Sequence, residues 1–338
     1  MIRLDFQTLA EKVQGKLINE QFGNDRFAGV SIDSRTIVKE QLFVAIAGSN
    51  ADGHSYIDDA LQKGGAGLVI AENYAGLSAL PEQVPIVTVD DTHRALITLA
   101  AEYRRLVDPE CIAVTGSNGK TTTKEMIYAM IRARRKKAYR SEGNLNNLYG
   151  LPLTLLAMPP GTAFGIFELG ISVPGEMTQL AEIVEPDLAL ITNVGPTHLE
   201  MLDSVGKVAE EKFTLVDRMK SDQPVIINGD DRELIAQADM RDRKFIRYGL
   251  GEENDFIASR LGITEDGYSL VSIGGRGVTL KLFGNHQVYN MLGAYTTCQV
   301  LGIDLSADEL ENLTYTLAPY RGEIENVNDL TLIADCYN

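Results

Sequence analysis

The stretch CIAVTGSNGKTTTKEM, residues 111–126, decides the fold. A short apolar strand leads into a glycine-rich turn, which is followed by a lysine, three threonines and a helix-forming segment. The usual phosphate loop has four residues between its first glycine and the Gly-Lys pair, whereas Gly116 and Gly119 enclose only two. The order of parts still suits a phosphate, because glycines let backbone N–H groups turn inward and a helix N-terminus carries partial positive charge.

The residues after these glycines add the remaining chemistry of a nucleotide site. Lys120 can neutralise phosphate oxygens, and the hydroxyl of a following threonine can ligate Mg²⁺. The alternative is an ordinary strand-to-helix turn with a lysine in solvent. Because strand, glycines, Lys-Thr pair and helix occur together, we favour nucleotide binding.

Further apolar runs follow this loop, separated by helical patterns, and each ends in glycine or a polar residue. This rhythm predicts a parallel sheet with helices on both faces. Residues 256–284 break the rhythm with strand-like segments around a turn at Glu265–Gly267, which predicts an antiparallel edge. A helix is expected from about His286, and Ser306 with Glu309 predicts a capping box. The predicted parallel strands are CIAVTG, FGIFELG, LALITNVG and PVIING.

The sequence before the loop predicts a separate, smaller α/β domain. Short strands such as FAGVSI and LFVAIAG precede a helix and strand in SYIDDALQKGGAGLVIAE. The segment VDPE, residues 107–110, is the expected joint. We therefore expect one domain over residues 1–107 and a central P-loop-type domain over residues 108–322.

The bulk composition limits the possible partners and compartments. The chain has 338 residues and a formal net charge of −16, which disfavours a nucleic-acid or anionic-membrane surface. Its three cysteines have no spacing typical of zinc ligands or a disulfide framework. The N-terminus lacks the apolar core of a signal sequence, and no long apolar run occurs. We expect a cytoplasmic protein.

Polar residues directly after the predicted strands are candidates for the site, since ligands gather beyond the carboxyl ends of parallel strands. Glu168 could hold Mg²⁺, although a carboxylate there is sometimes only a helix cap. His198 follows another strand, yet a lone histidine is more often a structural hydrogen-bonding group. Asn144, Asn146 and Asn147 follow a third strand, although asparagines near glycine usually form turns.

Taken together, these segments resemble one family, the ATP-dependent Mur ligases. The resemblance covers essentially the whole chain. Within the family, GNLNNLYGLPLTLL is similar to the branch that adds D-alanyl-D-alanine to UDP-N-acetylmuramoyl tripeptide. The segments that carry the resemblance, in order, are SIDSRTIVKEQLFVAIAG, DGHSYI, TGSNGKTTTKE, GNLNN, ELG, NVGPTHLE, EEKFTL, GNHQVYNMLGA, APYRGE and IADCYN.

The resemblance implies roles for named residues around ATP. Lys120 would cradle the phosphates and act in catalysis, with Thr121 near the first Mg²⁺. Asn290 would contact the adenine, Arg321 the phosphates and Asp335 the ribose. The residues implied for the loop itself are Gly116, Ser117, Asn118, Gly119, Lys120, Thr121 and Thr122.

The resemblance also implies a second metal ion, held by Glu168 and His198. Lys212 matches a lysine that family members carry as a carbamate, which would turn a cation into an anion able to support metal. From sequence alone, Lys212 reads as a surface helix lysine.

The implied reaction activates a peptide carboxylate with ATP and then joins it to an amine. The expected partners are UDP-N-acetylmuramoyl tripeptide and D-alanyl-D-alanine, used by a monomer in peptidoglycan precursor synthesis. Asp33, Ser34 and Arg35 would lie near the uridine diphosphate of the substrate, and Asn144 and Asn147 at the acceptor side. Without the resemblance, this DSR segment is an unremarkable turn.

Some features depart from the family pattern. The sequence ends at IADCYN, where relatives continue into a dinucleotide-fold domain, so residues 323–338 are expected to be only its start. We therefore expect this chain to bind the UDP substrate, to bind ATP weakly and to have little ligase activity alone. APYRGE lacks the expected Pro-Gly before Arg321, and Ala334 stands where a second aspartate is common.

Two other functions remain open at this point. One is a sibling ligase that adds a diamino acid to a dipeptide, or glutamate to folate, although GNLNN disfavours it. The other is a substrate-binding module without catalysis. A plain small-molecule kinase is less favoured, because it would not need the DSR and DGH segments together.

Overall fold

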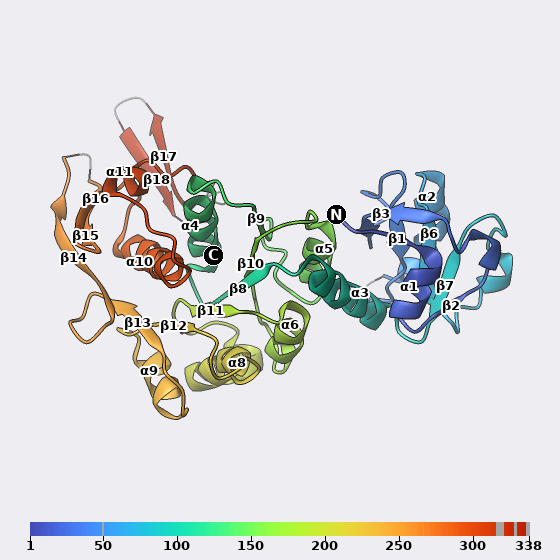
Figure 1. The fold of residues 1–338 in the computed structure, drawn as a ribbon, viewed down its shortest axis with the longest axis horizontal. Helices are drawn as coiled ribbons and strands as arrows, with labels where there is room; N and C mark the ends of the chain where they lie inside the picture. Colours follow the sequence, from blue (N-terminus) through green and yellow to red (C-terminus); the bar gives the residue numbers. More distant parts are fainter. Residues whose placement is uncertain (49–50, 266, 316–320, 328–329, 336–338) are drawn as a thin grey trace. The chain divides into compact units, whose positions relative to one another are not determined.

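The computed structural model describes residues 1–48, 51–265, 267–315, 321–327 and 330–335. By its internal contacts the chain forms two compact units, and Figure 1 labels their elements where there is room. Unit 1 consists of Met1–Pro109 and Leu148–Thr162, and unit 2 of Glu110–Asn147 and Ala163–Asn338.

Unit 1 contains, in its described part, a five-stranded sheet in the order β2-β7-β6-β5-β4. The β2–β7 pair is antiparallel and the other pairs are parallel. Phe43, Leu68 and Ile70 are buried in the core of this sheet. The elements are β1 (Arg3–Asp5), α1 (Phe6–Lys12), β2 (Lys16–Leu17), η1 (Glu20–Phe22), β3 (Arg26–Ala28), β4 (Val30–Ser31), β5 (Leu42–Val44), η2 (Gly53–Tyr56), α2 (Ile57–Gln62), β6 (Gly67–Ala71), η3 (Leu77–Ala79), β7 (Ile86–Val89), α3 (Thr92–Val107) and α5 (Gly150–Ala157).

Helix α5 belongs to unit 1 although it comes later in the sequence than the first strand of unit 2. It packs against α3, and the Ile2 N–H donates to the Leu156 carbonyl at 2.8 Å. The Tyr103 hydroxyl also donates to the Met158 carbonyl, at 2.8 Å. The sequence analysis included these residues in the range 108–322, because an almost wholly apolar helix gives no indication of which sheet it will cover.

Unit 2 is built on a nine-stranded sheet, counted over the described residues, in the order β16-β15-β14-β13-β12-β11-β8-β10-β9. The elements are β8 (Glu110–Thr115), α4 (Lys120–Ala133), β9 (Ala138–Arg140), β10 (Phe164–Glu168), α6 (Glu176–Val184), β11 (Leu188–Ile191), α7 (Leu199–Leu202), α8 (Val205–Asp217), β12 (Val225–Asn228), α9 (Arg232–Asp239), β13 (Ile246–Gly249), β14 (Phe256–Ile263), β15 (Ser269–Ile273), β16 (Arg276–Leu280), α10 (Asn285–Val300), α11 (Ala307–Glu311), β17 (Arg321–Val327) and β18 (Leu330–Asp335).

The predicted parallel sheet is confirmed, with the opening stretch at its centre. Strand β8 pairs in parallel with β10 on one side and β11 on the other. Helices α4 and α10 pack together on one face of the sheet, whereas α6, α8 and α9 lie on the other (Figure 1). The strands predicted from FGIFELG, LALITNVG and PVIING are β10, β11 and β12.

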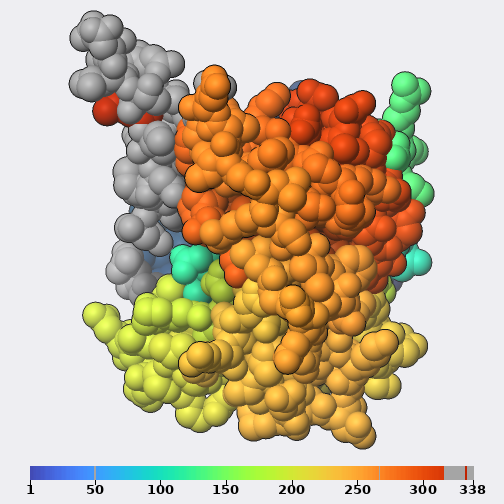
Figure 2. Space-filling view, turned by 90° about the vertical axis from the view of Figure 1, so that its left-hand side faces the viewer, coloured from blue at the N-terminus to red at the C-terminus, as the bar shows by residue number. Residues whose placement is uncertain are grey.

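The predicted antiparallel edge is also confirmed. Strand β14 continues the parallel sheet through β13 and pairs antiparallel with β15, which pairs antiparallel with β16. Figure 2 shows this face, where orange residues of β14–β16 lie at the surface. Helix α10 contacts β14 and β15, and α11 contacts β16. Helix α10 starts at Asn285, next to the predicted start, and Ser306 with Glu309 forms the predicted capping box.

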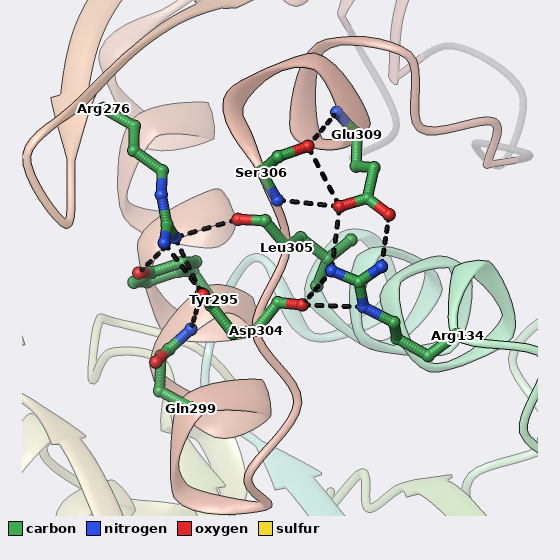
Figure 3. A network of polar contacts seen from close by, with 8 residues as sticks. All are labelled: Arg134, Arg276, Tyr295, Gln299, Asp304, Leu305, Ser306 and Glu309. Atoms are coloured by element: carbon green, nitrogen blue, oxygen red, sulfur yellow. Dashed lines mark hydrogen bonds and ion pairs between the residues drawn. The ribbon is translucent and has the colours of Figure 1, made fainter.

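A polar network fastens the segment before α11 to its neighbours (Figure 3). The Arg276 guanidinium donates to both carboxylate oxygens of Asp304, at 2.7 and 2.8 Å, and to the Leu305 carbonyl at 2.8 Å. These hydrogen bonds hold the pKa of Asp304 down, at about 2. Arg134 donates to the Asp304 carbonyl and to Glu309. The network joins α4, β16 and α11.

The described residues include no helix that is both long enough and apolar enough to cross a membrane.

Candidate active site

A cavity of about 520 Å³ lies in unit 2 beyond the carboxyl ends of β8, β10, β11 and β12. In the sheet, β10 and β9 lie on one side of β8, and β11 and β12 lie on its other side. The chain therefore changes direction across the sheet at β8. Such a reversal opens a crevice at the strand ends, where ligands of open α/β sheets bind. We call this cavity the loop pocket, because residues 117–122 form one wall of it.

The loop before α4 can only be built with glycine at two positions. Gly116 has φ 149° and Gly119 has φ 80°, a backbone region that side chains disfavour. A Cβ atom would lie 1.9 Å from Thr192 Oγ1 at Gly116, and 2.2 Å from Asn290 Oδ1 at Gly119. The glycines therefore allow both the turn and the close packing of the loop against its neighbours.

The segment after β11 holds this loop through a set of short hydrogen bonds. The Ser117 N–H donates to the Asn193 carbonyl, and the Asn118 N–H donates to Asn193 Oδ1, each at 2.9 Å. The Thr192 hydroxyl donates to the Asn118 carbonyl at 2.6 Å. The loop is thus fixed before any ligand binds, which lowers the entropy cost of binding.

Lys120 bends back over the loop that precedes it. Its ammonium donates to the carbonyls of Gly116 at 2.8 Å and Ser117 at 3.2 Å. It is also the first residue of α4, so the positive end of that helix lies at the same place. Charge and dipole together make this wall a site for an anion such as a phosphate.

Glu168, at the end of β10, is held in the same pocket although only 2% of its surface is exposed. The Thr121 hydroxyl donates to its Oε2 atom at 2.8 Å, and Asn146 Nδ2 donates to Oε1 at 2.8 Å. A hydroxyl and a carboxylate are oxygen ligands of the kind that Mg²⁺ prefers, with phosphate and water completing the shell. No cluster of three or more His, Cys, Asp or Glu in the described residues could hold a metal alone.

The asparagine-rich segment reaches the pocket with two of its three side chains. Asn144 and Asn146 line the cavity, whereas Asn147 is not among the lining residues. The Gly170 N–H donates to the Asn146 carbonyl at 2.9 Å, so the segment is tied to the end of β10. The sequence analysis weighed all three asparagines and took Asn144 and Asn147 from the resemblance as site residues. Asn144 and Asn146 line the cavity, and the role of Asn147 stays a prediction.

The first two turns of α10 form the opposite wall, which His286, Gln287, Tyr289 and Asn290 line. Asn290 is buried; its Oδ1 accepts from the Thr123 hydroxyl at 3.3 Å, and its Nδ2 donates to Gln287 Oε1 at 3.0 Å. These contacts fix its amide against the glycine loop.

Tyr289 is held in this wall by Asp230. Its hydroxyl donates to Asp230 Oδ2 at 2.9 Å, and the N–H groups of Leu250 and Gly251 donate to the same carboxylate. Burial and the Asp230 hydrogen bond raise the pKa of Tyr289 to about 12, so its hydroxyl stays a donor. Neither residue was singled out from sequence, because a tyrosine and an aspartate 59 positions apart carry no local pattern.

His198 lies outside the lining of the loop pocket. It is the N-terminal cap of α7, has φ 55°, and lines a different cavity of unit 2 with Val173 and Met201. The Oγ1 atom of its neighbour Thr197 lies 3.2 Å from Ser117 Oγ. The role of His198 at a second metal therefore stays a prediction.

Lys212, on α8, is a buried lysine and not the surface residue that its sequence suggested. Only 2% of it is exposed, and its amine has no hydrogen bond to any residue that the structure describes. Burial, followed by the positive charge of Lys120, lowers the pKa of Lys212 to about 7. A large fraction of this amine is therefore uncharged near neutral pH.

Asp33, Ser34 and Arg35 lie together in one turn of unit 1. Arg35 Nη2 donates to Asp33 Oδ2 at 2.7 Å, and this pairing lowers the pKa of Asp33 to about 2. Ser34 is buried, and the Lys63 ammonium donates to its carbonyl at 2.8 Å. The Arg35 side chain is 85% exposed and is therefore accessible to an anion.

Arg321 and Asp335 are backbone partners across the β17–β18 pair. Their side chains lie outside the part of the chain that the structure describes, so the predicted contacts with phosphate and ribose stay predictions.

Two family profiles match the chain. One, described as the Mur ligase middle domain, matches residues 114–298, and the other, described as the Mur ligase family catalytic domain, matches residues 26–104.

Curated relatives extend this similarity over the full chain. A UDP-N-acetylmuramoyl-tripeptide–D-alanyl-D-alanine ligase of Bacillus subtilis is 34% identical, and the match covers 100% of this chain and 73% of the relative. Proteins with the same name from Haemophilus influenzae and Escherichia coli are 31% and 30% identical, and each match covers 100% of this chain and 74% of the relative.

Solved structures have the same fold. MurF from Acinetobacter baumannii superposes with a TM-score of 0.88 at 24% identity, over 100% of this chain and 74% of that one. MurF ligase from Thermotoga maritima, solved in complex with ADP, gives a TM-score of 0.81 at 25% identity, over 92% of this chain and 71% of that one.

Proposed function

Because this chain belongs to the Mur ligase family, we propose that it joins D-alanyl-D-alanine to UDP-N-acetylmuramoyl tripeptide at the expense of ATP, in the cytoplasmic synthesis of peptidoglycan precursors. The observation that carries the proposal is the loop pocket. There a glycine loop, a lysine and a buried carboxylate face one cavity, in a chain 30% to 34% identical to ligases of that name. The ADP complex of the Thermotoga maritima relative supports ATP as the nucleotide.

The reaction has two steps. The terminal carboxylate of the tripeptide attacks the γ-phosphorus of ATP; a P–O bond forms, the bond to the bridging oxygen breaks, and ADP leaves. The amine of D-alanyl-D-alanine then attacks the acyl carbon, phosphate leaves with its oxygen, and the nitrogen loses a proton. Both steps crowd negative charge, so Lys120 and the N-terminus of α4 would stabilise it where the phosphates lie.

Thr121 and Glu168 are the residues that would hold Mg²⁺, since their oxygens adjoin each other at the rim of the glycine loop. When bound, the metal would neutralise charge on the phosphates. Asn146 fixes the Glu168 carboxylate by donating to its other oxygen. Glu168 and His198 are our proposed residues for the second ion, as the family resemblance implies.

Lys212 is proposed to act as a carbamate. Its uncharged amine would attack carbon dioxide, form an N–C bond and release a proton, which leaves an anionic carboxylate on the lysine. Burial and a low pKa near Lys120 favour this chemistry, because only an unprotonated amine is a nucleophile. The positive charge of Lys120 would then stabilise the carbamate instead of opposing an ammonium.

We assign the uridine diphosphate of the substrate to unit 1, at Asp33, Ser34 and Arg35. The exposed guanidinium of Arg35 supports this assignment, because Arg binds phosphate through two parallel hydrogen bonds. Within unit 2, Asn144 and Asn147 are proposed to lie on the acceptor side.

The glycine loop yields a first prediction. Gly119→Ala is expected to weaken ATP binding by at least about tenfold, because the new methyl group would collide with Asn290 and an alanine there is strained by roughly 1–2 kcal/mol. Calorimetric titration with ATP and Mg²⁺ measures this.

The matched control is Gly175→Ala. Gly175 has a similar φ of 86°, but nothing lies within 4 Å of its added Cβ. Both variants should lose stability, whereas only the first should lose ATP affinity. Equal ATP affinities of the two variants would contradict the close packing of Gly119 against Asn290.

A panel of amine donors tests the function itself. UDP-N-acetylmuramoyl tripeptide, ATP and Mg²⁺ are supplied with D-alanyl-D-alanine, a diamino acid or glutamate, and phosphate release is followed. The panel is run with the 338-residue chain and with a fusion to the part of the Bacillus subtilis relative that the match leaves uncovered. The fusion is expected to release phosphate when D-alanyl-D-alanine is present, whereas the 338-residue chain alone should release little. A preference of the fusion for a single amino acid would refute the proposal.

A further inference from the structure

Lys124, on α4 one turn after Lys120, is a charged side chain that the mechanism above does not use. It has no exposed surface. Its ammonium donates to the Ser141 carbonyl at 2.6 Å and lies 3.4 Å from the Gly143 carbonyl. The helix that carries the phosphate-binding lysine is thus fastened, through a second lysine, to the start of the asparagine-rich segment.

The same ammonium lies between two buried carboxylates. It is 3.4 Å from Glu125 Oε1 and 3.9 Å from Glu168 Oε2. Glu125 is also paired with Arg140, whose Nε donates to Glu125 Oε2 at 2.6 Å. Two cations therefore balance two carboxylates in this cluster.

Ser141 completes the connection to the metal-binding carboxylate. Its hydroxyl oxygen accepts from the Glu168 N–H at 3.1 Å, while its carbonyl accepts from Lys124. Five residues further along the same segment, Asn146 donates to Glu168 Oε1. Lys124 thus restrains both the carboxylate and the segment that supplies its other hydrogen-bond partner.

From these contacts we infer that Lys124 is a positioning residue for the nucleotide–metal site, which acts through Glu168 and Asn146. The inference rests on the nucleotide- and Mg²⁺-binding part of the proposed function. Burying a lysine among carboxylates is expensive, and an apolar side chain of similar volume is often as stable or more stable. A requirement for one fixed orientation of Glu168 explains why the ammonium is there.

The test compares ADP binding by Lys124→Met and the parent chain, in Mg²⁺ and in EDTA, by calorimetry. Residues that orient a metal ligand typically contribute roughly 10- to 100-fold in metal affinity. We expect the enhancement of ADP binding by Mg²⁺ to fall by that factor, while ADP affinity in EDTA changes by less than about threefold. Lys124→Arg, which retains the cation, should recover part of the enhancement.

Two further variants separate this effect from a general loss of stability. Arg276→Met breaks the ion pair with Asp304 in the same unit and should leave the Mg²⁺ enhancement unchanged. If Lys124→Met does not fold, Ser141→Ala removes the hydroxyl that orients Glu168 and should reduce the enhancement in the same way. Hydrogen exchange of residues 141–147 should also become faster in Lys124→Met.

An unchanged Mg²⁺ enhancement in Lys124→Met, or in Ser141→Ala where that variant replaces it, overturns the inference. An equal loss in Arg276→Met also overturns it, because the effect would then be one of stability. The measurement involves no amine donor, so failure of the amine panel would refute the proposed function and leave this inference standing.

Discussion

Lys120→Met is expected to lower the rate of phosphate release from ATP by roughly 10²- to 10³-fold. The Lys120 ammonium already lies over the glycine loop, 2.8 Å from the Gly116 carbonyl, so it is in place before the phosphates arrive. Preorganised positive charge acts on the transition state without reorganisation, and methionine has similar length but no charge. The rate is measured with the fusion used for the amine panel, and ATP affinity by calorimetry.

Lys207→Met is the matched control, because it removes a lysine from the exposed surface of α8. Its rate should equal that of the parent. Lys120→Arg should also be slow, since a planar guanidinium cannot make the contacts of a compact ammonium inside the loop. Near-parental phosphate release by Lys120→Met would mean that the γ-phosphate lies elsewhere.

The glycine loop was predictable from sequence because its chemistry is contiguous. Gly116, Gly119 and Lys120 occur within five residues, directly after a strand and before a helix. Glu168 was predictable for a different reason, since polar residues at the ends of parallel strands meet at one edge of the sheet. The order of residues along the chain and the topology of the sheet were therefore enough to predict the glycine loop, Lys120 and Glu168.

The remaining residues of the site are brought there by contacts between segments that are distant in sequence. Asn193 holds the loop through its amide, and Asp230 holds Tyr289, yet neither pair is close in sequence. Lys124 follows three threonines on an ordinary helix, and it is buried where its ammonium meets the carbonyls of the segment after β9. Such residues are found only once the strands are assembled.

Lys212 shows most clearly that burial cannot be predicted from the local sequence alone. The segment EEKFTL resembles a family motif, but without that resemblance a lysine beside two glutamates on a helix reads as solvent-exposed. In the structure Glu210 is exposed and Glu211 is half-buried, where it accepts from the N–H groups at the start of α6, while Lys212 and Phe213 are buried. Whether Lys212 is buried or exposed depends on which face of α8 packs against the sheet, and the local sequence does not indicate that face.

Lys212→Met is expected to stabilise the fold while it reduces ligase activity. Lowering the pKa of a lysine from 10.5 to about 7 corresponds to roughly 5 kcal/mol, at about 1.4 kcal/mol for each tenfold change in proton affinity. Methionine removes this penalty and fills a similar volume. The rate of phosphate release should fall roughly 10- to 100-fold, as expected for a group that supports a metal site.

The effect of pH on the stability of the parent chain follows from the lowered pKa of Lys212. Below pH 7 the folded chain must hold a buried ammonium, so the full penalty is present. Between about pH 7 and 10.5 the unfolded chain binds the proton and the folded chain does not, so the parent becomes more stable as pH rises. The stability advantage of Lys212→Met should therefore be largest below pH 7 and shrink towards pH 10.5, as measured by urea unfolding in buffers free of carbon dioxide.

Two further variants and an isotope-labelling experiment test the role of Lys212 independently. Lys212→Arg keeps a permanent cation in the buried site and should destabilise the fold, whereas Lys207→Met should leave both stability and activity unchanged. With ¹³C-labelled carbon dioxide, the parent should give a carbamate signal that Lys212→Met lacks. A mutation that strengthens the fold while it weakens the reaction indicates a residue retained for function. If Lys212→Met were instead destabilised at pH 6 and fully active, Lys212 would be an ordinary part of the core.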